Sequence, residues 1–236
     1  MRMLWPQLPA DVTYVATDLN QPMLDFAASA LRDPRVRWQV ADATDLPFDD
    51  ASFDVVLCQF GAMFFPDRVR AFSEARRVLA PGGTFLFNVW DAIDRNDFAA
   101  VITDALGAMF PENAPRFLPR TPHGYHDVAL IRQDLTDAGF GSITIETVTA
   151  QSVAPSALAA ATAYCRGTVL RTEIETRDAG ALDEATHRAA AAIAAAARGR
   201  RGPRPDPGAR GDRGRLRSRG ARAQQDTEES TRGIRR

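Results

Sequence analysis

Lysine is absent from this chain of 236 residues, so all 29 basic residues are arginines. We interpret this as the codon bias of a GC-rich genome rather than as chemistry. Only two cysteines are present, Cys58 and Cys165. They form no CxxC pair and lie near no cluster of histidines, which argues against a disulfide framework and against a zinc site. The sequence therefore predicts no bound metal, and a reducing, cytoplasmic location is the default expectation.

Long apolar runs are also missing. No segment approaches the roughly 18 uncharged apolar residues of a transmembrane helix, and the N-terminal residues lack the apolar centre of a secretory signal. Apolar residues make up 45 % of the chain and charged residues 25 %. Because both fractions are near the globular average, we expect an α/β domain of ordinary size with a real hydrophobic core and no membrane partner.

The net charge of −1 hides an asymmetry. Residues 198–236 carry 13 arginines against five acids, whereas residues 1–197 carry 16 arginines and 25 acids. The last stretch has no aromatic residue and no periodicity and is rich in Gly and Pro, so we predict a disordered tail. Its arginines suit nucleic acid or an anionic membrane, but no aromatic side chains are interleaved with them. A solvated tail is the preferred interpretation, and no nucleic-acid partner is expected.

Strand and helix patterns alternate over residues 1–150. The predicted strands are 12–17, 36–40, 53–58, 84–89 and 142–149, and the predicted helices are 22–31, 66–79, 95–109 and 127–138. This alternation predicts a mostly parallel sheet with right-handed crossovers and flanking helices. Residues 151–197 are rich in alanine and predict a second, helical part that could cover a substrate.

Acids follow two neighbouring strands of the predicted sheet, at the edge where ligands of open parallel sheets bind. Asp18 could accept hydrogen bonds from both hydroxyls of a ribose. Asp42, one strand later, could accept from an exocyclic amine such as adenine N6, with the Ala43 N–H meeting a ring nitrogen, and Leu19 and Phe48 could wall the base. A single Asp after a strand is commonly a helix cap or turn residue. The pair, with the strand order that follows, favours a nucleoside site.

Four segments carry a resemblance to a known family: VATDLNQPML (15–24), ADATDLPF (41–48), FDVVLC (53–58) and RVLAPGGTF (77–85). In order and spacing they resemble successive motifs of class I S-adenosylmethionine-dependent methyltransferases, especially the small-molecule enzymes of ubiquinone and menaquinone biosynthesis. The similarity covers about residues 10–150. It implies a Rossmann-like α/β fold, S-adenosylmethionine as cofactor, and methyl transfer to an O, N or C atom of a small molecule.

The resemblance also implies roles for single residues. Asp18 would bind the ribose, Leu19 would pack on the adenine, Asp42 and Ala43 would bind its amine and ring nitrogen, and Gln59 would lie near the transferred methyl. We expect acceptor contacts from residues 59–65, from the loop 110–126 and from the helices after 150. No catalytic base stands out. His123 and His126 are candidates because an imidazole is tuned for neutral pH, although two ordinary surface histidines are the favoured interpretation. Cys58 is expected to be a small buried apolar residue rather than a nucleophile.

Two departures from the family pattern stand out. The family has a glycine-rich loop roughly twenty residues before the ribose-binding acid, but no glycine precedes Asp18. The arginine-rich tail stands where the last strand is expected. We therefore expect a sheet without its first and last strands, in a chain that begins at an internal methionine and ends in a shifted reading frame.

Two alternatives stay open: a fragment or pseudoenzyme that does not bind the cofactor, and an NAD(P)-dependent Rossmann oxidoreductase, whose ribose-binding acid also ends the second strand. The Asp42–Ala43 pair and the Pro-Gly-Gly turn at 81–83 favour the methyltransferase over the oxidoreductase.

Overall fold

The structure is a computed structural model that describes residues 9–199 and 214–226. Strand β1 (Tyr14–Asp18) pairs in parallel with β2 (Val36–Val40), and helix α1 (Gln21–Ala30) connects them. Pro22 lies in the first turn of α1, where its missing N–H would have had no partner in the helix. The predicted strands and helix of this segment are confirmed to within two residues.

The larger sheet has four strands in the order β3-β4-β6-β5. Strand β3 (Phe53–Gln59) runs parallel to β4 (Leu79–Trp90), with α2 (Arg68–Val78) as the crossover. Gly82 has a φ of +81°, the positive angle expected of the Pro-Gly-Gly turn. Strand β5 (Thr144–Ala154) closes the sheet through antiparallel pairing with β6 (Gly214–Asp226), which is also antiparallel to β4. The expected α/β fold with parallel crossovers is confirmed.

Strand β6 corrects two expectations. Residues 214–226 were predicted to belong to a disordered tail, and the sheet was predicted to lack its last strand. Instead their backbone pairs with β4 from Thr84 to Trp90 and with β5 over its whole length. Pairing with β6 gives hydrogen-bond partners to the backbone groups along the edges of β4 and β5, which would otherwise be open. The composition of residues 214–226 does not reveal this pairing, because the partner strands lie far away in the sequence. Residues 198 and 199 of the predicted tail end helix α8, and the tail residues 200–213 and 227–236 lie outside the described residues.

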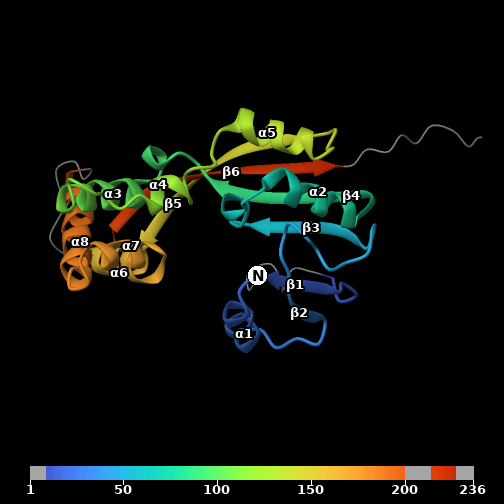
Figure 1. The fold of residues 1–236 in the computed structure, drawn as a ribbon, viewed down its shortest axis with the longest axis horizontal. Coiled ribbons are helices and arrows are strands. Elements are labelled where there is room, and N and C mark those ends of the chain that lie inside the picture. The colour runs from blue at the N-terminus through green and yellow to red at the C-terminus, as the bar shows by residue number, and fades with distance from the viewer. Residues whose placement is uncertain (1–8, 200–213, 227–236) are drawn as a thin grey trace, which may run out of the picture.

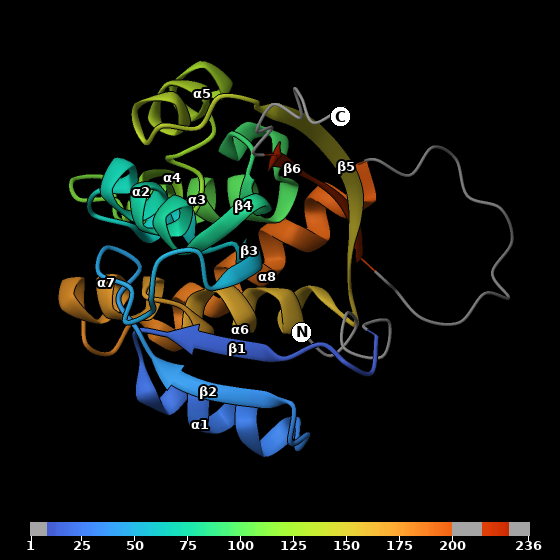
Figure 2. The same ribbon diagram turned by 90° about the vertical axis from the view of Figure 1, so that its right-hand side faces the viewer.

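The two sheets are separate in the structure. Among the described residues, β1 and β3 are both edge strands, and no described strand lies between them. Figure 1 and Figure 2 show the unit of β1, β2 and α1 lying below β3. The two neighbouring strand tips that carry Asp18 and Asp42 therefore belong to this smaller unit.

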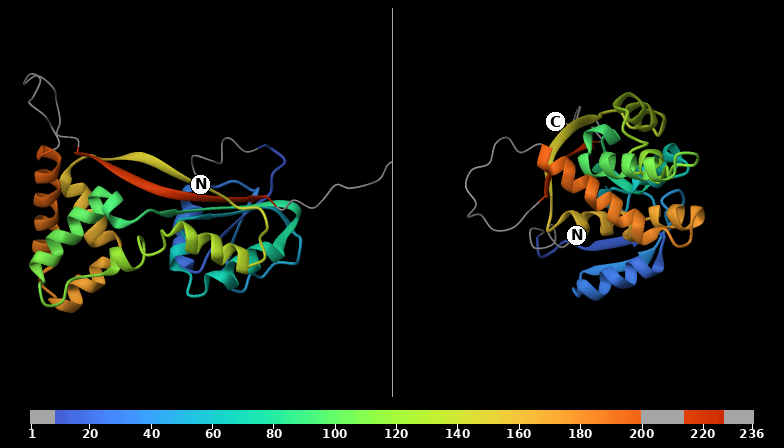
Figure 3. Two further views of the ribbon diagram at one scale, coloured as in Figure 1. Left: turned by 90° about the horizontal axis from the view of Figure 1, so that it is seen from above. Right: turned by 90° about the vertical axis from the view of Figure 1, so that its left-hand side faces the viewer.

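The helices of the second half gather at one end of an elongated molecule. Figure 3 shows them joined to the sheet region by the long strands β5 and β6. They are α3 (Asp97–Met109), α4 (Phe117–Arg120), α6 (Ala157–Gly167), α7 (Leu170–Arg177) and α8 (Leu182–Gly199). Helix α5 (Val128–Asp137) instead packs beside α2 on the sheet. No described helix has both the length and the apolar character needed to span a bilayer.

Two large apolar clusters hold these parts together. One lies between the sheet and its helices and is rich in aromatic rings, with Phe72 stacked on Phe87 at 5.0 Å and Phe85 on Phe140 at 5.6 Å. The other joins α3 and α4 to α6, α7 and α8. The helical part thus contains residues 97–120 as well as the expected 151–197. A cavity lies between this helical part and the sheet.

Candidate functional site

Asp18 and Asp42 lie at neighbouring strand tips, as predicted. Asp18 ends β1, and Asp42 follows the partner strand β2, whose Val40 is in register with Asp18. In each side chain, Oδ1 accepts the N–H of the residue two positions later at 2.8 Å, Asn20 for Asp18 and Thr44 for Asp42. Both acids are exposed, and no described residue donates to either Oδ2. Each carboxylate is therefore oriented but keeps one oxygen free to accept from a ligand.

The neighbours of these acids have the character that an adenine site needs. The side chain of Leu19 is 69 % exposed, so an apolar surface stands open beside Asp18. Ala43 is half-buried next to Asp42. The hydrogen bonds from Thr44 lower the pKa of Asp42, which keeps this carboxylate charged. The ring of Phe48 is half-buried and packs edge-on against Phe53 at 5.0 Å.

Gln59 ends β3 in the other sheet and is exposed there. Among the described residues, no hydrogen bond joins it to Asp18 or to Asp42. The structure thus brings the two acids together on neighbouring strands and places Gln59 at the tip of a separate one.

A cavity of about 430 Å³ opens beyond the tips of β3 and β4. Residues from the three segments expected to contact an acceptor line it: Phe60 and Met63, Phe117 and His123, and Tyr164 and Thr168. Its volume is in the range of small-molecule sites, which are mostly apolar with a few polar groups. This cavity can hold a compact organic molecule between the sheet and the helical part.

Phe60 and Trp90 form one wall of the cavity. Their rings stack with centroids 4.3 Å apart and planes 16° apart. Phe60 has a φ of +52°, a left-handed conformation that costs a bulky residue on the order of 1 kcal/mol or more. Its N–H donates to the backbone oxygen of Asn88 at 3.1 Å, which holds the strained residue in place. Strain held by its surroundings is typical of ligand sites.

His123 is a buried polar residue of the cavity wall, with an exposed fraction of 5 %. The interpretation of His123 as a surface residue is therefore wrong. Its burial depends on long-range packing beside Trp90, and the centroids of the two rings are 6.3 Å apart. Nδ1 lies 2.9 Å from the carbonyl oxygen of Asp91. Because a carbonyl only accepts, Nδ1 must carry the proton, which leaves a lone pair on Nε2. Burial lowers the pKa of His123, so the ring is neutral at pH 7.

Neither His126 nor Cys58 is among the residues that line the cavity. His126 is exposed, and its Nδ1 is bound to the carbonyl oxygen of His123 at 2.8 Å. Burial raises the pKa of Cys58 to about 11, which makes this thiol a poor nucleophile. Within residues 9–199 and 214–226, no three His, Cys, Asp or Glu side chains come together as a metal site.

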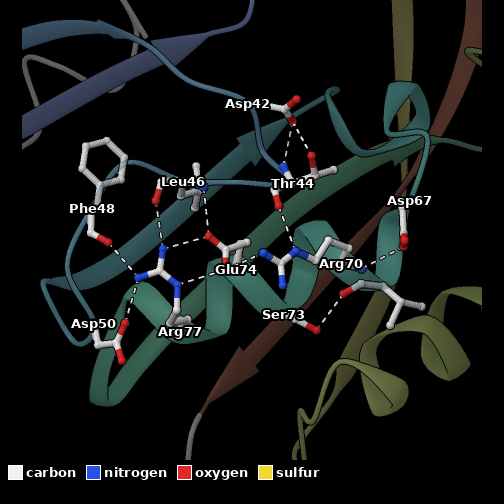
Figure 4. A network of polar contacts seen from close by, with 11 residues as sticks. Asp42, Thr44, Leu46, Phe48, Asp50, Asp67, Arg70, Ser73, Glu74 and Arg77 are labelled. Carbon is white, nitrogen blue, oxygen red and sulfur yellow. Dashed lines mark hydrogen bonds and ion pairs between the residues drawn. The ribbon is translucent and has the colours of Figure 1, made fainter.

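Sequence reasoning missed the residues that hold the loop after Asp42. This loop is held by a network of hydrogen bonds from three side chains of α2, namely Arg70, Glu74 and Arg77 (Figure 4). The sequence did carry a signal for this contact. The three residues are spaced by four and three positions on a predicted helix, so they share one face of it, and an acid-rich loop precedes that helix. Trp90 lies in the strand end 88–91, where ligands of parallel sheets are expected, but the sequence assigned it no role of its own.

Comparison with known proteins agrees with these features. A family profile described as a methyltransferase domain matches residues 3–87. A demethylmenaquinone methyltransferase of Thermus thermophilus is 32 % identical over 146 residues, which are 57 % of this chain and 66 % of the relative. A ubiquinone/menaquinone biosynthesis C-methyltransferase of Idiomarina loihiensis is 41 % identical over 81 residues, about a third of each chain (33 % and 32 %). Over the matched residues the chain is thus similar to class I S-adenosylmethionine-dependent methyltransferases.

Solved structures confirm the methyltransferase fold. A protein of Bacillus halodurans that has been proposed to be a methyltransferase superposes with a TM-score of 0.56 at 18 % identity, over 92 % of this chain and 84 % of that one. Phosphoethanolamine N-methyltransferase 2 of Haemonchus contortus, in complex with S-adenosyl-L-methionine, gives a TM-score of 0.53 at 18 % identity, over 96 % of this chain and 46 % of that one. Curated relatives are matched over 66 %, 58 % and 61 % of their own lengths, so this chain spans less than two thirds of them.

Proposed function

We propose that this chain transfers a methyl group from S-adenosylmethionine to a small-molecule acceptor held in the cavity. The observation that carries the proposal is the pair of carboxylates at neighbouring strand tips, each with one oxygen fixed by the backbone and one oxygen free. Asp18 would hold the ribose hydroxyls, and Asp42 with Ala43 would hold the adenine edge. The two unpaired cysteines are in keeping with action in a reducing compartment such as the cytoplasm.

The described residues fit the nucleoside half of the cofactor. A ribose offers two hydroxyl donors and adenine offers an amine donor, and the free Oδ2 atoms are acceptors suited to both. Leu19 offers the apolar contact that an aromatic base needs. A glycine-rich loop for the methionine end does not occur among the described residues before β1, and the binding-deficient alternative rests on that feature.

The acceptor would lie against the stacked rings of Phe60 and Trp90. When bound, the cofactor supplies a methyl group on a positively charged sulfur, which is a good leaving group, so alignment of the acceptor would provide most of the rate acceleration. Gln59, at the tip of β3, would lie between the nucleoside site and this cavity. The neutral Nε2 of His123 would accept a proton from the acceptor.

Isothermal titration of the full chain with S-adenosylhomocysteine and with NAD tests this function. We expect saturable uptake of S-adenosylhomocysteine and none of NAD. Tighter binding of NAD would establish the oxidoreductase alternative, which none of the relatives named above supports. Uptake of neither compound would establish the binding-deficient alternative.

A further inference from the structure

The loop between β2 and β3 carries Asp42 and Ala43 but does little to fix its own shape. Its internal backbone bonds are those from Asp45 N–H to the Asp42 oxygen at 3.1 Å and from Phe48 N–H to the Leu46 oxygen at 2.8 Å. Apart from an isolated bridge between Asp42 and Asp45, residues 41–52 form neither helix nor strand. The position of this loop must therefore be set by what it packs against.

One face of α2 supplies that support. Arg70, Glu74 and Arg77 are four and three residues apart and therefore project from the same side of the helix. They contact every second residue along the loop (Figure 4). Arg70 Nε donates to the Thr44 oxygen at 3.0 Å, and Glu74 Oε2 accepts the Leu46 N–H at 2.9 Å. The side chains of α2 thus act as a template along which the loop lies.

Arg77 is the centre of this network, because every donor of its guanidinium is used. Nε and Nη2 donate to the two carboxylate oxygens of Glu74 at 2.9 and 2.8 Å. Nη2 also donates to the Leu46 oxygen at 2.8 Å, and Nη1 donates to the Phe48 oxygen at 2.7 Å and to Asp50 Oδ1 at 2.8 Å. Five N–H groups meet five acceptors, three of them on the loop.

Glu74 makes the network sensitive to the loss of any member. Its exposed fraction is only 4 %, and hydrogen bonding from Arg77 is the main cause that lowers its pKa. Arg70 adds a second cation at 3.7 Å. A buried carboxylate without its cation is strongly destabilising. Weakening Arg77 should therefore release both Glu74 and the loop residues that Glu74 holds.

We propose that Arg77 is a positioning residue of the nucleoside site, which fixes residues 43–50 on α2 so that Asp42 and Ala43 stand ready at the strand tip before the cofactor arrives. The proposal rests on the proposed function, because the loop has this role only where Asp42 binds the nucleoside. A purely structural role of Arg77 is the competing explanation, and the experiment is designed to separate the two.

The test uses Arg77→Lys in the full chain. Lysine keeps the charge but offers a single ammonium group, which cannot reproduce the planar fork that joins Glu74 to the loop carbonyls. The matched control is Arg76→Lys, one residue earlier on the exposed side of α2, where no hydrogen bond or ion pair of the described residues is lost. A second control, Ile193→Val, loosens the buried core of α8 away from the loop.

Two readouts are compared at a temperature where all variants are folded. Hydrogen exchange reports the loop directly, and we expect at least tenfold faster exchange of the amides of Thr44, Asp45, Leu46 and Phe48 in Arg77→Lys alone. Calorimetry with S-adenosylhomocysteine reports the site, and we expect at least fivefold weaker binding in Arg77→Lys and unchanged binding in both controls.

The outcomes separate this proposal from the proposed function. Unchanged loop exchange in Arg77→Lys overturns the proposal whatever the ligand does. Faster exchange with unchanged affinity, or equal loss of affinity in Ile193→Val, shows a purely structural role and also overturns it. If the wild-type chain takes up no S-adenosylhomocysteine, the proposed function fails, and the positioning role fails with it even where the loop responds.

Discussion

The carboxylates of Asp18 and Asp42 are held in the same way on adjacent parallel strands, with Oδ1 of each bound to the backbone N–H two residues later at 2.8 Å. This repeated geometry fixes the direction of both side chains without a ligand. It also leaves both Oδ2 atoms without a donor among the described residues, and Leu19, the residue after Asp18, is exposed. Preset acceptors of this kind reduce the ordering cost of binding, since the site need not reorganise.

The buried imidazole of His123 predicts a pH dependence of stability. Burial lowers its pKa in the folded chain below the ordinary value near 6.5, so the unfolded chain binds more protons in the window between the two values. Stability should therefore rise as the pH rises through that window and should be fully regained above about pH 7. Urea unfolding of the wild type and of His123→Gln between about pH 5 and pH 7.5 checks this. An equally steep dependence in His123→Gln would contradict it.

The loop that carries His123 depends on a close backbone approach at Gly124. A Cβ at this position would overlap the carbonyl group of Arg120, whereas a Cβ at Gly107, within α3, would meet nothing within 4 Å. We expect Gly124→Ala to destabilise the fold by about 1–3 kcal/mol. Gly107→Ala should stabilise it by roughly 0.5–1 kcal/mol, because alanine is the better helix former. Denaturant unfolding of both variants measures these changes, and equal effects would refute the assigned contacts.

Both thiols should resist alkylation in the folded chain. Burial raises the pKa of Cys58 and of Cys165 to about 11. At pH 8 only about a thousandth of such a thiol is the reactive thiolate, compared with roughly a quarter for a free cysteine. Iodoacetamide labelling followed by mass spectrometry should therefore be slow in buffer and fast in urea. Rapid labelling of native Cys58 would reopen the question of a nucleophile at the end of β3.

The parts of the fold that local patterns determine could be read from the sequence. Pro22 marks the start of α1, Gly82 the turn within β4 and Gly139, with a φ of +86°, the end of α5. The two acids were found because strand ends are visible as changes from β-rich runs to polar residues. Each of these features depends on a few neighbouring residues.

The features that escaped prediction depend on residues far apart in the chain. Arg77 contacts Leu46 and Asp50 across 31 and 27 positions. The buried ring of His123 contacts the carbonyl oxygen of Asp91, which is 32 positions away. The strand 214–226 pairs with β4 and β5, which no composition rule anticipates. In each case the stabilising partner becomes visible only once the fold has brought the segments together.

The central claim is that Asp18 and Asp42 hold the nucleoside of the cofactor. Its most direct test is the affinity of the full chain for S-adenosylhomocysteine in the wild type, Asp18→Asn and Asp42→Asn, with Asp49→Asn as an exposed acid of the same loop. Hydrogen bonds to a charged group contribute about 1.5–3 kcal/mol, so we predict affinities roughly ten- to 150-fold weaker for the first two variants and unchanged for the third. Binding that survives both substitutions at the wild-type level would contradict the account.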